Sequence, residues 1–240
     1  MGHVVTFAHL PGETIADGVT RASITARDAR EMAAAFVRVA PGKRWTGAAP
    51  HGSDCYLFML NGSAAISAGV GHCKLSSQAF ATVEEGVEFT VEGDPGGPAD
   101  IVEVVAPPSP NRRGLPGFKG RLSIAERGKT PVVPVPEERK QRIYFVGDHR
   151  GARSERGHAM IVIYEKDTVT ALHHHPDAES MFVPLDGALQ FTVNGEDVLL
   201  GPGQAAYFAI GDNHGLRVAE GHNGASFLEF HIPAAFTTVK

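Results

Sequence analysis

Apolar and polar residues alternate over short stretches along most of the chain, with the period of two that is typical of half-buried β-strands. Turn sequences such as Asn194-Gly195 and Gly201-Pro202-Gly203 separate these stretches. A helical period occurs only over Arg27–Ala35. The pattern therefore predicts an all-β fold, built as an antiparallel barrel or sandwich. In the second half of the chain the predicted strands are Ala159–Tyr164, Thr168–Leu172, Ser180–Leu185, Leu189–Val193, Asp197–Leu200, Ala205–Ala209, Leu216–Ala219 and Ser226–Ile232.

The pattern of strands and turns occurs twice. FVRVAPGKRWTGAAPHGSDCYLFMLNG (residues 36–62) aligns without gaps with IVIYEKDTVTALHHHPDAESMFVPLDG (residues 161–187), at an offset of 125 residues. Few residues are identical, but the order of apolar strand, turn, polar loop and second strand is the same. Such a repeat predicts a tandem duplication. We expect an N-terminal barrel over residues 1–106, a proline-rich linker over 107–136 and a C-terminal barrel over 137–240.

Composition and charge exclude several classes of protein. The chain has 42% hydrophobic and 20% charged residues, which is typical of a globular protein. Its formal net charge is −5, and the basic residues cluster only in the linker, so we expect no nucleic-acid partner. No apolar stretch is long enough to span a membrane. The two cysteines provide neither a disulfide framework nor a cysteine metal site, and we expect a cytoplasmic protein.

Histidines are concentrated in the second copy, as His173-His174-His175 followed by His214. Residues two apart in a strand point to the same side, so His173 and His175 present two imidazoles together. If His214 lies on a neighbouring strand that faces the same interior, three nitrogen ligands converge. Imidazole suits Zn, Cu, Fe and Ni. The alternative is that the three consecutive histidines form a polar loop and that His214 is an isolated surface residue.

Two segments of the second copy, LHHHPDAESMFVPLDG and GPGQAAYFAIGDNH, resemble the two signature motifs of the cupin superfamily. The second has the family's Pro-Gly turn, with His214 eleven residues after Gly203. The resemblance covers residues 159–232 well and, through the repeat, residues 36–107 more weakly. It implies two tandem cupin double-stranded β-helix (jelly-roll) barrels, with a metal at the mouth of the second. His173, His175 and His214 occupy the family's three histidine positions.

The fourth ligand of the family is a glutamate, and here the sequence departs from the pattern. Ser180 stands in the glutamate's place, and Glu179 lies one residue earlier. A shift of one residue turns a side chain to the other face of a strand unless a bulge corrects it. We expect a bulge after the preceding proline turn and retain Glu179 as a ligand. The alternative is a site of three histidines, with water and substrate completing the coordination.

The first copy lacks the ligand pattern. At the offset of 125 residues, Ala48 and Pro50 stand in place of the first two histidines and Asp54 in place of Glu179; at an offset of 126, Glu88 stands in place of His214. Two carboxylates without imidazoles make a poor transition-metal site. We therefore expect one divalent metal per chain (Fe, Mn, Zn or Ni), held by the second barrel. The first barrel would be structural or dimerising, within a homodimer.

Three further residues are candidates for catalysis. Glu229 and His231 alternate with apolar residues on the last predicted strand, so they are able to reach the barrel interior as a base and its orienting partner. The alternative is a polar, solvent-facing side of that strand. Tyr207 precedes His214 and is a candidate proton donor, although an interior aromatic residue is common at such a position.

The resemblance implies a metal-dependent enzyme acting on a small organic substrate. A site of three histidines leaves coordination positions for O₂ and a chelating substrate, so our main interpretation is an Fe(II)-type dioxygenase, an oxidoreductase. With Mn, Zn or Ni the same ligands suit an isomerase, a decarboxylase or a hydrolase. A non-catalytic metal- or ligand-binding cupin is the third interpretation, and metal analysis separates it from the enzymes.

Overall fold

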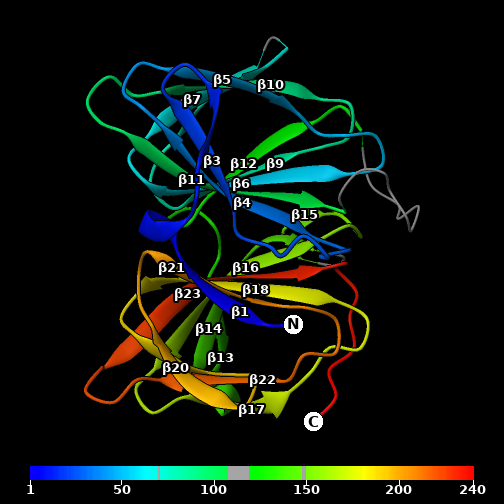
Figure 1. Ribbon diagram of the computed structural model, residues 1–240. Helices are drawn as coiled ribbons and strands as arrows, with labels where there is room; N and C mark the ends of the chain where they lie inside the picture. Colours follow the sequence, from blue (N-terminus) through cyan, green and yellow to red (C-terminus); the bar gives the residue numbers. More distant parts are fainter. Residues whose placement is uncertain (70, 108–118, 148–149) are drawn as a thin grey trace.

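The computed structural model of the protein describes residues 1–69, 71–107, 119–147 and 150–240. Over these residues nearly all regular structure is antiparallel strand, with two single-turn 3-10 helices at Phe7–His9 and Pro136–Glu138. No helix in the described ranges has the length and hydropathy needed to span a membrane. The strands form four sheets that are layered from one end of the molecule to the other (Figure 1). The predicted all-β fold is confirmed.

The N-terminal half contains a seven-stranded and a four-stranded sheet that enclose an apolar core around Trp45, Leu57 and Phe89. The seven-stranded sheet has the order β12 (Leu122–Glu126), β9 (Ala79–Val83), β6 (Asp54–Asn61), β11 (Ala99–Ala106), β4 (Ala33–Val39), β3 (Val19–Ser23) and β2 (Glu13–Ala16). The four-stranded sheet has the order β5 (Arg44–Ala48), β10 (Glu88–Gly93), β7 (Ala64–Ala68) and β8 (Gly71–Leu75).

The C-terminal half repeats this arrangement around a core that includes Phe182, Phe191 and Phe227. Its eight-stranded sheet runs β1 (His3–Thr6), β21 (Gln204–Phe208), β18 (Glu179–Asp186), β23 (Gly224–Ile232), β16 (His158–Glu165), β14 (Lys140–Gly147) and β13 (Val133–Val135), with β15 (Ala152–Arg153) beside β14. Its four-stranded sheet runs β17 (Val169–His173), β22 (His214–Val218), β19 (Leu189–Val193) and β20 (Glu196–Leu200). All eight strands predicted for this half are present, with every boundary within two residues.

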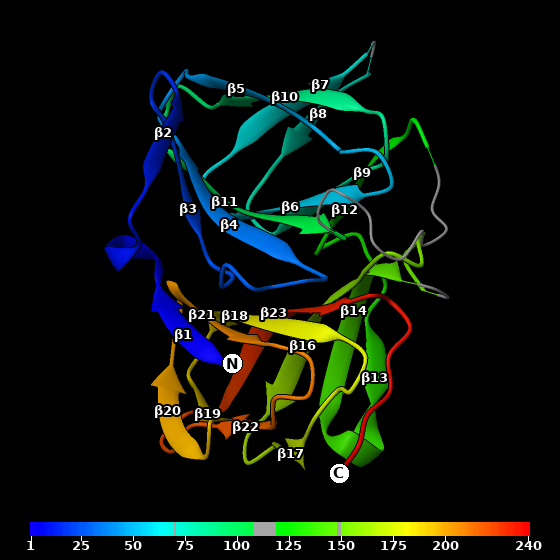
Figure 2. The same cartoon turned by 45° about the vertical axis from the view of Figure 1, so that its right-hand side comes forward.

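The two large sheets pack against each other and form a third apolar core between the halves (Figure 2). Aromatic side chains from both halves meet there, as when the rings of Phe80 and Phe145 stack with their centroids 4.9 Å apart. Met181 and Val183 on β18 face this core, whereas Phe182 faces the interior of the C-terminal half. Alternate residues of β18 therefore serve two different cores.

The closing glycines of the repeat, Gly62 and Gly187, have positive φ angles of 77° and 70°. A Cβ atom at either position would approach a backbone carbonyl oxygen, that of Pro98 at 2.2 Å and that of Gly224 at 2.4 Å. Only glycine adopts this conformation without strain and tolerates such an approach. The two turns are therefore equivalent in structure as well as in sequence.

The strand pairing differs from the predicted domain boundaries in two places. β1 lies in the range assigned to the N-terminal barrel, but it pairs with β21 of the C-terminal half. β12 and β13 lie in the predicted linker, yet they pair with β9 and β14. Residues 108–118 of the linker are outside the described residues. The edge strands β21, β9 and β14 would otherwise present unpaired backbone N–H and C=O groups. β1, β12 and β13 supply hydrogen-bond partners for these groups, which explains why they join the sheets. The helical period at residues 27–35 does not form a helix. Residues 27–32 lie in a loop, and β4 begins at Ala33.

Candidate metal centre

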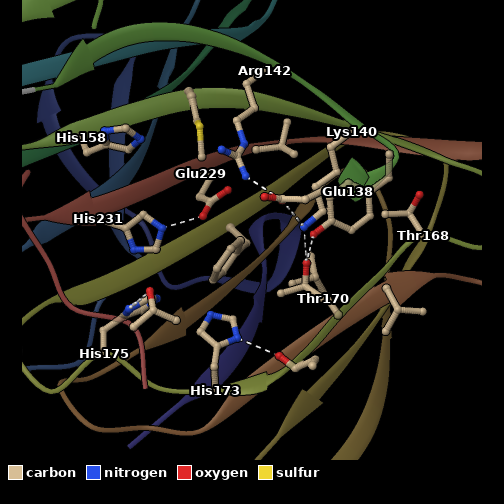
Figure 3. Close-up of a pocket in the computed structure, with 18 of the residues that line it drawn as sticks. Glu138, Lys140, Arg142, His158, Thr168, Thr170, His173, His175, Glu229 and His231 are labelled. Carbon is tan, nitrogen blue, oxygen red and sulfur yellow. Dashed lines mark hydrogen bonds and ion pairs between the residues drawn. The ribbon is translucent and has the colours of Figure 1, made fainter. Parts of the chain in front are cut away.

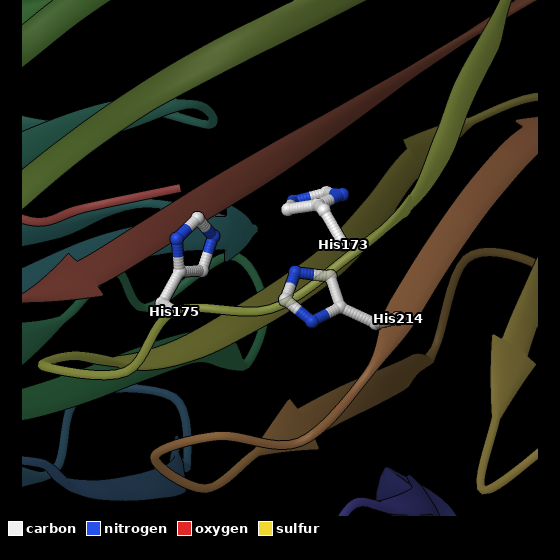
Figure 4. A group of neighbouring side chains, drawn as sticks. All are labelled: His173, His175 and His214. Carbon is white, nitrogen blue, oxygen red and sulfur yellow. The ribbon is translucent and has the colours of Figure 1, made fainter. Parts of the chain in front are cut away.

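His173, His175 and His214 come together at one end of the C-terminal half. His173 ends β17 and pairs directly with His214, the first residue of β22, while His175 follows in the connection to β18. Ring nitrogens of the three side chains lie within 4.8 Å of one another (Figure 4). His175 lies beyond the end of β17, and its ring still lies on the same side as that of His173, with ring centroids 5.0 Å apart.

Backbone carbonyls fix the tautomer of each histidine. Nδ1 of His173 lies 2.8 Å from the carbonyl oxygen of Ala171, and Nδ1 of His214 lies 3.1 Å from that of Asp212. Nδ1 of His175 lies 2.8 Å from the carbonyl oxygen of Thr237. Because a carbonyl oxygen only accepts hydrogen bonds, each ring carries its proton on Nδ1 and a lone pair on Nε2.

The Nε2 atoms of His175 and His214 are buried and have no hydrogen-bond partner. Buried polar atoms normally have a partner. Two neighbouring nitrogens that each carry an unshared lone pair therefore call for a ligand that binds lone pairs, as a metal ion does. A metal-binding imidazole typically donates its other N–H to a carbonyl or carboxylate, which is the arrangement found here. The three side chains therefore fit a divalent transition-metal ion.

Burial also keeps the imidazoles neutral. It lowers the pKa of His214 to about 3 and that of His175 to about 4, in each case with further lowering by neighbouring histidines. The pKa of His173 is lowered for the same main reason. Metal ions bind the neutral imidazole, so the site does not compete with protons at neutral pH.

Glu179 does not join the histidines. The pairing of β18 with β23 is regular from Glu179 to Pro184, so the bulge expected at this point is absent. Without it Glu179 faces the N-terminal half, where its carboxylate accepts hydrogen bonds from the backbone N–H groups of Arg30 (2.7 Å), Glu31 (3.1 Å) and Met32 (2.9 Å). Burial raises the pKa of this carboxyl, and the hydrogen bonds oppose that rise. The structure thus replaces the predicted fourth ligand with the three-histidine arrangement.

A cavity of about 950 Å³ lies beside the histidines. His173 and His175 line it, together with Glu229 and His231, both of which come from β23 (Figure 3). Nε2–H of His231 donates to Oε1 of Glu229 at 2.5 Å, and Oγ of Ser180 lies 2.9 Å from Nδ1 of the same ring. Ser180, in the place of the family's glutamate, therefore holds His231 from behind.

Glu229 is ionised in this environment. Burial by itself raises the pKa of the carboxyl, but the hydrogen bond and charge of His231, with smaller contributions from His158 and Arg142, lower it to about 2. The cavity therefore contains a permanent negative charge next to a histidine.

Two basic side chains of β14 line the same cavity. Nζ of Lys140 lies 2.8 Å from Oγ1 of Thr170 and 3.1 Å from a carboxylate oxygen of Glu138. A guanidinium nitrogen of Arg142 donates to the same Glu138 oxygen at 2.8 Å. Both cations are thus held in place at the cavity wall by a shared acid.

Comparison with known proteins identifies the domain that holds this site. The sequence profile of the family described as "Cupin domain" matches residues 160–231. This part of the chain is similar to a cupin domain, and it is called the cupin domain below. No curated protein sequence matches the chain.

Several solved structures share the fold over 99% of this chain, at 14% sequence identity. The oxalate decarboxylase of Lactobacillus farciminis in complex with formate has a TM-score of 0.73, with 88% of its own chain covered. The oxalate decarboxylase of Bacillus subtilis at pH 4.6 has a TM-score of 0.71, with 78% of its chain covered. A third structure, of the Bacillus subtilis enzyme studied for its Mn(II) centres, gives the same TM-score and coverage. At this identity the comparison establishes the jelly-roll fold.

Tyr207 lies on the side of the cupin domain away from the cavity. On β21 it pairs with Met181, a residue of the core between the halves, and its ring lies 5.2 Å from that of His3. Among the described residues, those that line the cavity do not include Tyr207. Burial and the nearby Glu179 carboxylate raise its pKa far above the usual value. The structure therefore places this predicted proton donor beside Glu179, away from the histidines.

The N-terminal half has no equivalent of the cupin domain's metal centre. Among the described residues, His173, His175 and His214 form the one group of three or more possible ligands within binding distance of one another. Ala48 and Glu88 pair directly on β5 and β10, at the positions of His173 and His214. Asp54, at the position of Glu179, instead forms a buried ion pair with Arg156 at 3.0 Å.

Sequence reasoning missed several residues of the cavity wall. Ser180 was recognisable as the occupant of the glutamate position, but its contact with His231 follows only from the regular register of β18. Lys140 and Arg142 lie on a strand with no equivalent in either signature motif. Phe236 follows the last strand in a segment without periodic pattern, and no sequence signal places it at the cavity.

Proposed function

We propose that the cupin domain binds one divalent metal ion through His173, His175 and His214 and decarboxylates a small organic acid. The observation that carries this proposal is the pair of buried Nε2 atoms, of His175 and His214, that have no partner. His175 lines a cavity whose wall also holds an ionised carboxylate, that of Glu229, and the cations of Lys140 and Arg142.

The charges of the cavity favour an anionic substrate. Glu138 is paired with both Lys140 and Arg142, while Glu229 keeps its negative charge and accepts a hydrogen bond from His231. The neutral imidazoles leave the two positive charges of a bound metal uncompensated, so the loaded cavity attracts anions. When bound, the metal supplies a Lewis acid that takes oxygen ligands and accepts electron density.

The chain's own residues provide orientation, water exclusion and a proton. Met160, Val162 and Phe182 form an apolar part of the wall and keep water from the reacting carbon. Loss of CO₂ breaks a carbon–carbon bond and leaves its electron pair on the remaining carbon, which then takes a proton. The pair of Glu229 and His231 holds a proton between Oε1 and Nε2, at the cavity wall. We assign to this pair the delivery of that proton: the pair takes up one proton from solvent and passes it to the carbon that CO₂ has left, so that R–COO⁻ and H⁺ become R–H and CO₂.

The comparisons support the choice of decarboxylase among the alternatives. The three solved structures described above are oxalate decarboxylases, and one was studied for its Mn(II) centres. No finding supports the dioxygenase that was our main expectation from the sequence. We therefore rank Mn(II) first among the candidate metals and decarboxylation first among the reactions.

The test combines metal analysis with a screen of small carboxylic acids, oxalate included. We expect about one transition-metal ion per chain, its loss in His214→Ala, and release of CO₂ without consumption of O₂. Consumption of O₂ in proportion to product would replace the decarboxylase with a dioxygenase. A protein that takes up no Mn(II), Fe(II), Zn(II) or Ni(II) would be a non-catalytic module, and the proposal would fail.

A further inference from the structure

We propose that residues 234–240, which we call the C-terminal strap, position His175 for metal binding and form part of the cavity. This inference rests on the metal centre of the proposed function, but not on the reaction. The strap follows β23 and runs beside the connection between β17 and β18 (Figure 2). It is joined to this connection by two backbone hydrogen bonds between His174 and Val239, of 2.9 and 3.0 Å.

His175 differs from the other two histidines in how its ring is held. The carbonyls that accept from His173 and His214 belong to Ala171 and Asp212, each only two residues away. The carbonyl that accepts from His175 belongs to Thr237, 62 residues away along the chain. The tautomer and orientation of this ring therefore depend on the strap being in place.

Thr237 is itself held by Asp177, through its backbone N–H and its hydroxyl. The carboxylate of Asp177 accepts the backbone N–H of Thr237 at 2.9 Å and its Oγ1–H at 2.8 Å. Asp177 lies two residues after His175, so the contacts form a closed ring: Asp177 fixes Thr237, and Thr237 fixes His175. Thr237 is exposed and Asp177 is half-buried, so the hydrogen bonds between them lie close to the surface and outside the core of the cupin domain.

Phe236 connects the strap to the proton-carrying pair. Its ring stacks on that of His231, with centroids 4.0 Å apart and planes 26° apart. It also meets the ring of His175 edge-on, at 4.9 Å and 80°. Phe236 thus packs against both the metal-binding histidine and His231, whose own rings meet edge-on with centroids 4.8 Å apart. Displacing the strap would open the cavity to water from this side and free both rings at once.

The experiment releases the strap from its anchor and measures the binding of cobalt(II) to the full chain. Asp177→Ala removes both hydrogen bonds to Thr237, and Thr237→Pro removes the N–H and hydroxyl donors while keeping the carbonyl. We expect each to weaken Co(II) binding about 10-fold or more, as loss of a hydrogen-bonded support of a ligand does. We also expect a change in the visible absorption spectrum of the bound cobalt. Asp177→Asn, which retains an acceptor oxygen, should restore part of the affinity.

Two controls separate this inference from the proposed function. Glu196→Ala removes an exposed carboxylate of the same half, far in sequence from the strap, and should leave affinity and spectrum unchanged. His214→Ala should abolish Co(II) binding; if it does not, the metal centre itself is wrong. If His214→Ala abolishes binding but Asp177→Ala and Thr237→Pro leave affinity and spectrum unchanged, the strap has no positioning role. Thermal unfolding of each variant establishes that it is folded.

Discussion

Each histidine of the metal centre donates its Nδ1–H to a backbone carbonyl, which leaves Nε2 as the atom that faces a ligand. The same burial that lowers their pKa values makes these rings costly to protonate. In the unfolded chain they would titrate near pH 6.5. The chemistry of the site and the acid stability of the protein are therefore linked through the same two side chains, His175 and His214.

We predict that the metal-free protein loses stability as the pH falls below about 6.5. The folded-state pKa values of His175 and His214, about 4 and about 3, lie below their unfolded values. Between these limits the unfolded chain takes up protons that the folded chain does not. The contribution of the two neutral histidines to the free energy of unfolding is therefore present at neutral pH and lost in acid. Urea unfolding from pH 7.5 to pH 4.5 measures this dependence. Replacing both residues with Gln should make it shallower; an identical dependence would contradict the assignment.

Glu229 provides a second test at the scale of the residue. Glu229→Gln keeps the size of the side chain but removes its negative charge and its strong acceptor for His231. We expect metal content to be retained and turnover to fall about 100-fold or more, as for the loss of an acid–base group. Glu196→Gln, an exposed substitution in the same half, is the control. Loss of metal in Glu229→Gln would instead place Glu229 among the ligands.

At the scale of the element, strand parity explains which sequence predictions hold and which do not. The period of two located all eight strands of the second half and put His173 and His175 on one side. The predictions that Glu179 is a ligand and Tyr207 a proton donor depended on the local register of their strands. A bulge that shifts this register leaves no distinct signal in the sequence. The pairing of His3 with Tyr207 joins residues about 200 positions apart, so local pattern could not assign β1 to its sheet. The strap has no period at all, and its contacts are set by tertiary structure alone.

The turn after β18 gives a prediction at this scale. Gly187→Ala would combine a left-handed backbone with a Cβ atom 2.4 Å from the carbonyl oxygen of Gly224. We expect it to lower the free energy of unfolding by about 2 kcal/mol or more. Gly195→Ala, where φ is +85° and no atom lies within 4 Å of the added carbon, should cost only about 1 kcal/mol. Equal losses in urea unfolding would mean that the close approach has no effect.

At the scale of the whole molecule, two equivalent acids hold the halves together. Glu179 begins β18 and accepts backbone hydrogen bonds from residues 30–32, just before β4. Asp54 begins β6 and bonds Ser154 and Arg156, just before β16. The repeat has thus preserved an acid at one position in both copies, with each acid directed at the other half. This explains why Glu179 is not available to a metal.

We predict that Glu179→Ala destabilises the protein without changing its metal content. The substitution removes the acceptor of three backbone N–H groups, two of them in buried residues, at a cost of about 2 kcal/mol or more. Urea unfolding and metal analysis of the same preparation measure both effects. Loss of metal with unchanged stability would return Glu179 to the role of ligand.

The second junction is expected to be more sensitive. Arg156 is buried and pairs with Asp54 at 3.0 Å and with Glu85 at 2.7 Å. Arg156→Ala leaves the buried Asp54 without its cation and Glu85 with only the exposed Lys119 and His51, and we expect a loss of about 3–5 kcal/mol. Arg217→Ala breaks a half-exposed pair with Asp197 and should cost less than about 1 kcal/mol. Similar losses in the two variants would show that burial of the Arg156 pairs does not matter.

The position of β1 limits how this molecule can be divided. A fragment cut at the repeat boundary to isolate the cupin domain would leave behind the strand that covers β21, and the uncovered backbone of β21 would be ready to pair with another copy. Descendants of a duplicated unit are often imagined as separable modules. Here the first strand of the chain completes a sheet of the second half, so the smallest working form retains both.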